Sequence, residues 1–210
     1  MTLKKQENAL RLMKILIDSG GKLLQRRIEM WPEKVAGQLI TPLSGARRYH
    51  DVFAFDNGAY TQFKEKRFIA LLKREYEHRD KCLFVAVPDK VGSHNDTLKM
   101  WSAYNHLADG YKKAFVAQDG YEGYPDGTEC LFIGGTNDFK DTQESFDAVV
   151  DAKKAGLFVH VGRVTGVKRF MFYEDAGADT CDGSGLTRFD ATFLSLRDRY
   201  NKQKNQHVLF

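Results

Sequence analysis

The chain has 210 residues, 42% of them hydrophobic and 29% charged, which is typical of a single globular domain with a sizeable core. The 32 Lys and Arg residues against 28 Asp and Glu residues give a net charge of +4, which permits a phosphate-bearing partner without requiring one. No apolar run is long enough to span a membrane, and the first residues lack the apolar core of a signal peptide, so we expect a cytoplasmic protein.

The predicted elements begin with a helix at about residues 4–18. Short apolar runs then alternate with stretches whose apolar residues recur every three or four positions. The runs are QLI near residue 39, which is the weakest, VFAF at 52–55, CLFVAV at 82–87, AFVAQ at 114–118, CLFI at 130–133, LFVHV at 157–161 and ADTC at 178–181. Helical faces are predicted around Phe68, Leu98, Phe146 and Val167, followed by a closing helix at about 190–202 and a loose tail at 201–210.

Runs that are apolar at consecutive positions, separated by amphipathic helices, indicate parallel strands that are buried on both faces. An open doubly wound sheet and a (β/α)8 barrel both fit this order. The dinucleotide-binding version of the open sheet is weakened because no G-x-G-x-x-G follows the first strand. We predict one domain over 1–210 that folds as a compact (β/α)8 TIM-like barrel at about 37–200, shorter than the usual length of about 250 residues.

Polar and glycine residues follow each of six predicted strands, where the strand ends. They are Asp56, Asp89, Gln118, the Gly134-Gly135 pair, Gly162 with Arg163, and Asp182. The carboxyl ends of parallel strands lie on one face, which carries the active site in a barrel. Any one of these residues could instead be a turn former or a helix cap. Their recurrence after six strands favours a site.

Two carboxylates on one rim suggest covalent chemistry at a sugar carbon. One carboxylate attacks the anomeric carbon, while the other gives a proton to the departing group and later recovers one. Gln supplies a hydrogen-bond donor and an acceptor, and Asp supplies an acceptor, which suits the amide edge of a purine. Glycine leaves backbone groups accessible to a flat ligand.

Taken in order, these segments resemble those of the tRNA-guanine transglycosylases. FDNGAY is similar to their DSGGF segment, VPDKVG to the second base-binding Asp segment, VAQDG to the segment with the base-reading Gln, and FIGGT to the Gly-Gly segment. VHVGRVTGVKRF is similar to M-G-x-G-T-P-x-D-L, and CDGSGLTR to FDCxxPTR, with Leu186 in place of Pro. The short length and the first motif resemble most closely the phage-encoded relatives that place 7-deazaguanines in DNA.

The resemblance implies roles for individual residues. Asp182 would be the nucleophile at C1′ and Asp56 the general acid/base. The base would be held by Asp89, Gln118, Gly134 and Gly135, with Val161 and Gly162 lining its pocket and Phe55 or Tyr60 stacking on it. Candidates for backbone phosphate contacts are Arg47, Arg48, Lys64, Lys66, Arg163, Lys168, Arg169 and Arg188.

The three cysteines are too scattered to form the zinc site of the tRNA enzymes. Cys82, Cys130 and Cys181 match neither C-x-x-C spacing nor a disulfide framework, so we expect no metal and no cofactor. The zinc subdomain supports tRNA binding in that family, and its absence favours DNA, with a single-stranded or flipped guanine as target and a 7-deazaguanine base as co-substrate.

Three functions remain open from the sequence. The first is base exchange in DNA. The second is a hydrolytic glycosylase of nucleic acid or nucleosides that uses the same two aspartates, and the third is a binding module without turnover. Retention of both Asp56 and Asp182 argues against the third, since buried anions are costly unless they are used. The sequence does not indicate which deazaguanine is used, or the oligomeric state.

Overall fold

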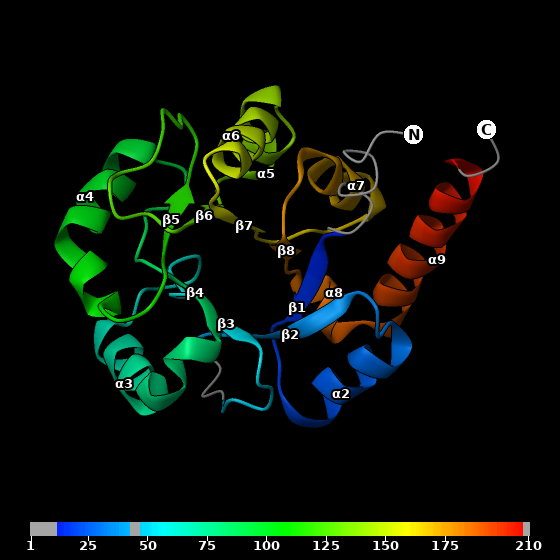
Figure 1. The fold of residues 1–210 in the computed structure, drawn as a ribbon, viewed down its shortest axis with the longest axis horizontal. Coiled ribbons are helices and arrows are strands. Elements are labelled where there is room, and N and C mark those ends of the chain that lie inside the picture. Colours follow the sequence, from blue (N-terminus) through cyan, green and yellow to red (C-terminus); the bar gives the residue numbers. More distant parts are fainter. Residues whose placement is uncertain (1–11, 43–46, 208–210) are drawn as a thin grey trace.

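Eight parallel strands close into a barrel in chain order (Figure 1). The structure is a computed structural model and describes residues 12–42 and 47–207. The strands are β1 (Lys14–Ile17), β2 (Val35–Ile40), β3 (Phe53–Phe55), β4 (Cys82–Ala86), β5 (Lys113–Ala117), β6 (Cys130–Ile133), β7 (Phe158–Val161) and β8 (Thr180–Cys181). Ile15 closes the barrel because it is in register with Val35 of β2 on one side and Cys181 of β8 on the other. The predicted (β/α)8 fold is confirmed.

Helices surround this barrel (Figure 1). They are α2 (Gly21–Met30), α3 (Glu65–Glu75), α4 (His94–Tyr104), α5 (Asn137–Lys140), α6 (Gln143–Lys154), α7 (Val167–Ala176), α8 (Ser184–Arg188) and α9 (Asp190–His207), with 3-10 turns η1 (Tyr76–Lys81) and η2 (Asn105–Ala108). The β5–β6 connection, 118–129, contains no helix, and neither do the described residues of the β2–β3 connection, 41–42 and 47–52. These plain connections help the barrel fit into a short chain.

Local sequence explains where several helices begin. Ser93 caps α4 by accepting a hydrogen bond from the Asp96 amide, and Thr142 caps α6 by accepting one from Ser145. Such side chains satisfy amides that have no partner inside the helix. None of the helices in the described ranges is long and apolar enough to cross a membrane.

The predicted helix at 4–18 is wrong over its described part, because residues 14–17 form strand β1. Ile15, Leu16 and Ile17 are all fully buried. Leu16 packs in the barrel interior, while Ile15 and Ile17 pack in the layer between strands and helices. A helix at the surface buries one face only, whereas a barrel strand buries both. Residues 4–11 lie outside the described part of the chain.

The C-terminal boundary also differs from the prediction. The segment 201–207, expected as a loose tail, continues α9. Lys204 in this segment forms an ion pair with Glu174 of α7, whose carboxylate also accepts from Tyr200 and from the buried Lys34. Residues 208–210 lie outside the described range.

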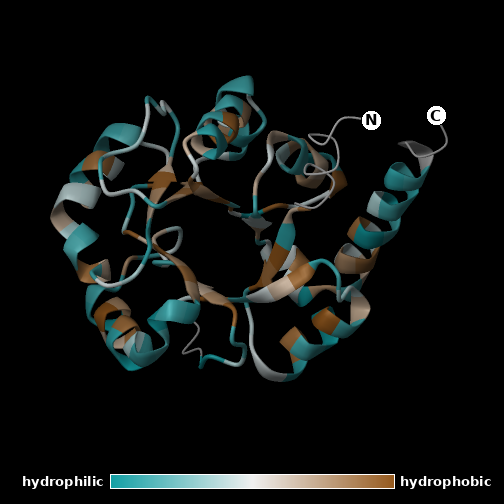
Figure 2. Ribbon diagram, in the orientation of Figure 1, coloured by the Kyte–Doolittle hydropathy of each residue, from teal (hydrophilic) through white to brown (hydrophobic). Residues whose placement is uncertain are grey.

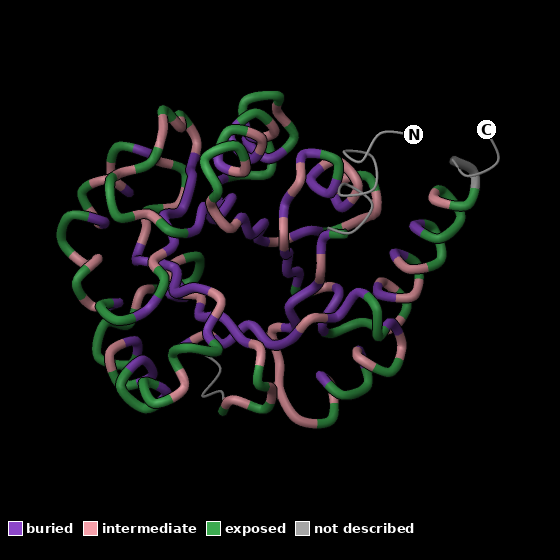
Figure 3. The backbone as a smooth tube through the Cα atoms, in the orientation of Figure 1, coloured by how far each residue is buried: buried purple, intermediate pink, exposed green. Residues whose placement is uncertain are grey.

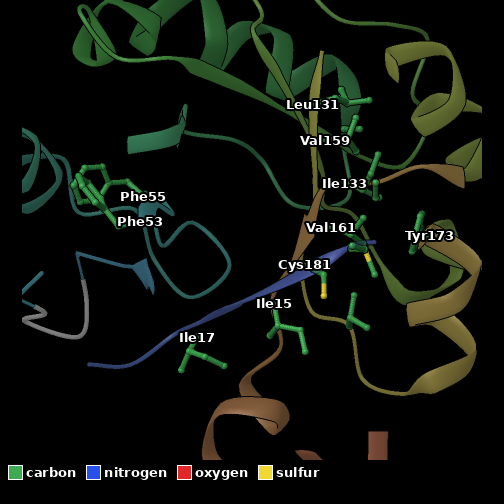
Figure 4. Packing of buried hydrophobic residues seen from close by; sticks show 14 of the residues in the cluster. Ile15, Ile17, Phe53, Phe55, Leu131, Ile133, Val159, Val161, Tyr173 and Cys181 are labelled. Atoms are coloured by element: carbon green, nitrogen blue, oxygen red, sulfur yellow. The ribbon is translucent and has the colours of Figure 1, made fainter. Parts of the chain in front are cut away.

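The core has two layers, one inside the barrel and one between the strands and helices. Alternation along each strand sends successive side chains to opposite layers. The inner layer consists of Leu16, Leu39, Ala54, Phe84, Ala86, Ala114, Val116, Cys130 and Phe132. Figure 4 shows part of the outer layer, in which Ile133 and Val161 of neighbouring strands lie close together. Hydrophobic residues are concentrated on the strands and inward helix faces (Figure 2), where the backbone is buried (Figure 3).

Candidate active site at the carboxyl ends of the strands

A cavity of about 610 Å³ opens where the carboxyl ends of the strands meet. Nine of the residues predicted from the sequence line it: Asp56, Asp89, Gln118, Gly134, Gly135, Gly162, Arg163, Asp182 and Arg188. All but Arg188 follow the ends of six strands, because closure of the barrel gathers segments that are distant in the sequence, and Arg188 is the last residue of α8. Tyr60, proposed as a stacking residue, also lines the cavity, whereas Phe55 is fully buried in the outer layer.

Val161 does not line this cavity. Its side chain is fully buried in the outer layer of the core. The neighbouring His160 points into the barrel instead, where its ring lies 4.6 Å from Phe132 and 4.9 Å from Phe84. Strand alternation therefore excludes the Val161 side chain from the role expected for it.

Six of the eight predicted phosphate contacts lie outside the cavity lining, including the exposed Lys64 and Lys66. Arg48 pairs with Glu75 at 3.1 Å, and Arg169 makes two hydrogen bonds with Asp141. Arg47 and Lys168 are exposed. Of the arginines predicted to contact nucleic-acid phosphates, Arg163 and Arg188 are those that line the cavity.

Asp182 directly follows β8 and is held by two hydrogen bonds at one oxygen. Its Oδ1 lies 3.1 Å from His160 Nε2 and accepts from the Arg163 amide at 3.2 Å. Because an ionised carboxylate only accepts, Nε2 of His160 is the donor to it, and Nδ1 of the same ring lies 2.8 Å from the Thr180 hydroxyl. Among the hydrogen bonds of the described residues, none is made to Oδ2, so this oxygen is available to a ligand.

Asp56 directly follows β3, and its carboxyl group both forms a turn and has a raised pKa. Its Oδ1 accepts from the Gly58 amide at 2.7 Å, which forms the turn that the Asp-Asn-Gly sequence favours. Burial raises the pKa of Asp56, and the Asp182 carboxylate raises it further, while the Gly58 hydrogen bond opposes the shift. The turn therefore holds a buried carboxyl group whose pKa is shifted upward.

Asp89 forms the centre of a hydrogen-bonded polar cluster at the end of β4. Its Oδ1 accepts from Asn57 Nδ2 at 2.8 Å, and its Oδ2 accepts from Gln118 Nε2 at 2.6 Å. The Gln118 side-chain oxygen accepts from the Gly92 amide at 2.9 Å. Burial raises the pKa of Asp89 to about 7. The cluster fixes a carboxyl group and an amide side by side at the cavity wall, where they can offer hydrogen-bond donors and acceptors to a ligand.

Glycine is needed beside this cluster because the backbone approaches closely. A Cβ at Gly134 would lie 2.5 Å from Val116 Cγ1 and 2.9 Å from Gln118 Nε2. Gly135 has a φ of +72°, and a Cβ there would lie 2.9 Å from Asp119 Oδ2. Gly134 therefore leaves room for Gln118 in its observed position, and Gly135 leaves room for Asp119.

The Arg163 side chain lies across the mouth of the cavity. Its guanidinium donates to Gly135 O and lies 4.2 Å from the centre of the Tyr60 ring. Arg163 has a φ of 56°, a left-handed conformation that is uncommon outside glycine. Tyr60 is 65% exposed, which leaves its ring accessible to a ligand at the mouth.

Asp18 is a cavity residue that the sequence reasoning missed. It directly follows β1, and its amide donates to the Thr187 hydroxyl at 3.2 Å. Burial raises the pKa of Asp18 to about 7, with the Asp182 and Asp56 carboxylates adding to the shift. The available signal was the KILI run followed by Asp, the same pattern that identified Asp56. It was overlooked because 4–18 was predicted as one helix.

Lys140 is a second cavity residue that was missed. It is the last residue of α5, is fully buried, and donates from Nζ to Gly162 O. The search for polar residues directly after strands does not find Lys140, because a loop and the short helix α5 separate it from the end of β6. Asn57, which donates to Asp89 in the polar cluster, is a cavity residue that the sequence indicates only as part of a turn. Within the described ranges, no three His, Cys, Asp or Glu side chains are grouped so that they could hold a metal ion.

Comparison with known proteins identifies the fold. A chain of the tryptophan synthase a2b2 complex from Pyrococcus furiosus is 12% identical, with a TM-score of 0.51, and the match covers 89% of this chain and 95% of that one. GH26A from a Muricauda species is 10% identical, with a TM-score of 0.48 and coverage of 86% and 87%. An aldolase, QR15, is 10% identical, with a TM-score of 0.47 and coverage of 95% and 97%. No protein-family model and no curated protein sequence matches the chain. The first match supports the (β/α)8 barrel.

Proposed function

We propose that the protein is a transglycosylase that exchanges guanine in DNA for a 7-deazaguanine base through a covalent glycosyl-aspartate. The observation that carries the proposal is the shared cavity. Asp56 belongs to the first of the motifs and Asp182 to the last, and both line the cavity together with the Asp89–Gln118 cluster. The residues to which we assign the roles of nucleophile, acid and purine-edge recognition therefore line one cavity. DNA as the polymer rests on the family resemblance of the sequence.

In the first half-reaction, Asp182 Oδ2 attacks C1′ of the target nucleotide. The C1′–N9 bond breaks with its electron pair passing to guanine, an ester forms between C1′ and Asp182, and Asp56 gives its proton to the departing base. The raised pKa of Asp56 supports the proton-donor role, since burial and the Asp182 charge favour its protonated form. The hydrogen bonds to Asp182 Oδ1 leave Oδ2 for the attack.

In the second half-reaction, guanine leaves and the deazaguanine takes its place. The Asp56 carboxylate removes the proton from N9 of the incoming base, N9 attacks C1′, and the ester bond to Asp182 breaks with its electrons returning to the carboxylate. Both half-reactions are the same step in opposite directions, so one pair of carboxylates serves both.

The base and the polymer would contact different parts of the cavity. Asp89 and Gln118 present carboxyl and amide groups to the purine edge. Arg163 and Arg188 line the cavity and provide cationic groups for phosphate oxygens. The Tyr60 ring at the mouth offers a surface on which a base can stack.

The test is base exchange with labelled guanine. A guanine-containing single-stranded oligodeoxynucleotide is incubated with the protein and isotope-labelled guanine, and label in the polymer is measured, with an RNA of the same sequence in parallel. We expect label in DNA, and none with Asp182→Asn or Asp56→Asn, while the exposed Asp126→Asn matches wild type. Release of guanine without incorporation would replace exchange by hydrolysis. If guanine is not released and label is not incorporated, the proposal is refuted.

A further inference from the structure

Lys140 is a buried cation at the cavity that the proposed mechanism leaves without a role. Its side chain is fully buried, and its ammonium group donates to Gly162 O. An ammonium group loses strong hydration when it is buried, so its position requires a compensating interaction. The carbonyl of Gly162 is one such partner, and it belongs to the loop directly after β7.

The peptide that accepts from Lys140 is the peptide that donates to Asp182. Gly162 O and the Arg163 amide are the two polar ends of a single peptide unit. Lys140 Nζ contacts the oxygen end, and the nitrogen end donates to Asp182 Oδ1 at 3.2 Å. A cation at the carbonyl polarises the peptide and strengthens the hydrogen bond that its N–H donates.

We propose that Lys140 is a positioning residue that acts on Asp182 through the Gly162–Arg163 peptide. The inference rests on the proposed function, in which Asp182 is the nucleophile. By fixing Oδ1, the peptide orients Oδ2 toward C1′, and the ammonium charge offsets the negative charge of the carboxylates around the cavity. Lys140 does not contact the substrate in this role.

The conformation of the loop supports this role. Among the described residues, Arg163 is the non-glycine residue with a positive φ. Such a conformation persists where the surroundings fix it. On one side Lys140 holds Gly162 O, and on the other the Asp182 main-chain oxygen accepts from the Val164 amide at 2.6 Å. The Gly162 amide donates to Ile133 O at 3.0 Å, so hydrogen bonds anchor the residues on both sides of the Gly162–Arg163 peptide.

Electrostatic coupling also connects the two groups. Burial lowers the pKa of Lys140 to about 7, with the Arg163 and Arg169 guanidinium groups adding to the shift, while the Asp182 and Asp141 carboxylates oppose it. The Lys140 charge and the Asp182 charge therefore interact within the same site.

The first experiment measures steady-state base exchange by Lys140→Met, which keeps an unbranched side chain one atom shorter and removes its charge. We expect kcat to fall by about 10- to 100-fold, the range for loss of one charge-assisted hydrogen bond, with KM for the base unchanged. Lys140→Gln can keep a hydrogen-bond donor without the charge, and we expect its kcat to lie between those of the wild type and Lys140→Met. The control is Lys154→Met, which removes an exposed lysine paired with Asp151. Wild-type kcat in Lys140→Met would overturn the inference.

The second experiment detects the effect of Lys140 on the Gly162–Arg163 peptide without measuring catalysis, and so separates this inference from the proposed function. In ¹⁵N-labelled protein, the Arg163 amide proton should move upfield in Lys140→Met, because the peptide N–H is less polarised, and should stay in place in Lys154→Met. An unmoved resonance in folded Lys140→Met or Lys140→Gln overturns the role of Lys140 even if the wild-type protein exchanges bases. A wild-type protein without exchange, in which the resonance still moves, refutes the proposed function alone.

Discussion

Replacing Asp18 with Asn should stabilise the protein, and by more at alkaline than at acidic pH. Burial and the neighbouring Asp182 and Asp56 carboxylates raise the pKa of Asp18 from 3.8 to about 7. In the unfolded chain the group ionises near its ordinary value. Between these two values the folded state binds the proton more tightly, so the ionised group costs stability as pH rises from about 4 to about 7 and the cost is constant above that.

The size of the effect follows from the pKa difference. About 3 units at about 1.36 kcal/mol each give a ceiling of about 4 kcal/mol at alkaline pH, against a typical total stability of about 5–15 kcal/mol. At about pH 5 the cost is roughly 1.5–2 kcal/mol, because only part of the titration interval has been crossed. The stabilisation by Asp18→Asn should therefore be larger at about pH 8.5 than at about pH 5 by about 2–3 kcal/mol.

The assay is urea unfolding at both pH values, followed by tryptophan fluorescence, since Trp31 and Trp101 are buried and become exposed on unfolding. Asp126→Asn is the matched control, because that side chain is exposed. An equal effect of Asp18→Asn at the two pH values, or destabilisation at the higher one, would show that the pKa of Asp18 is not raised in the folded protein.

Two further predictions concern the buried ion pair and the Gly-Gly segment. Lys34→Met should destabilise the fold by about 1.5–3 kcal/mol, because the buried Glu174 carboxylate loses the lysine 2.6 Å away but keeps Lys204 at 3.0 Å. Adding Glu174→Leu should restore much of that loss in chemical denaturation, and a purely additive double variant would contradict the pairing. Gly134→Ala should raise KM for the base, since its Cβ would lie 2.9 Å from Gln118 Nε2. Gly166→Ala, with nothing within 4 Å of its Cβ, should not, and equal KM values in the two variants would argue against base recognition by the Asp89–Gln118 cluster.

Strand ends were the part of the site that the sequence predicted well. In a parallel barrel the residue after each strand reaches the same rim, so Asp56, Asp89, Gln118 and Asp182 could be placed together without knowing any distance. The same logic failed for Asp18 only because its strand was assigned to a helix. The segment ALRLMKILI contains apolar residues at both spacings, and short runs of this kind do not distinguish a strand from a buried helix.

Contacts between side chains could not be predicted in the same way. Lys140 reaches the cavity from a short helix and Arg48 is held by Glu75, and both depend on which helix packs beside which strand. Val161 was placed in the pocket by the resemblance, although alternation along β7 directs His160 inward instead. Sequence spacing gives the face of an element, whereas a hydrogen-bond partner depends on the tertiary arrangement.

Isolation of the covalent intermediate tests the central claim most directly. The protein is mixed with a guanine-containing single-stranded oligodeoxynucleotide, quenched by denaturation, and analysed by intact mass spectrometry and peptide mapping. We predict an adduct with the mass of protein plus DNA without one guanine, attached to the peptide that contains Asp182 and absent from Asp182→Asn. An adduct at another residue, or one that persists in Asp182→Asn, would contradict the assignment of Asp182 as nucleophile.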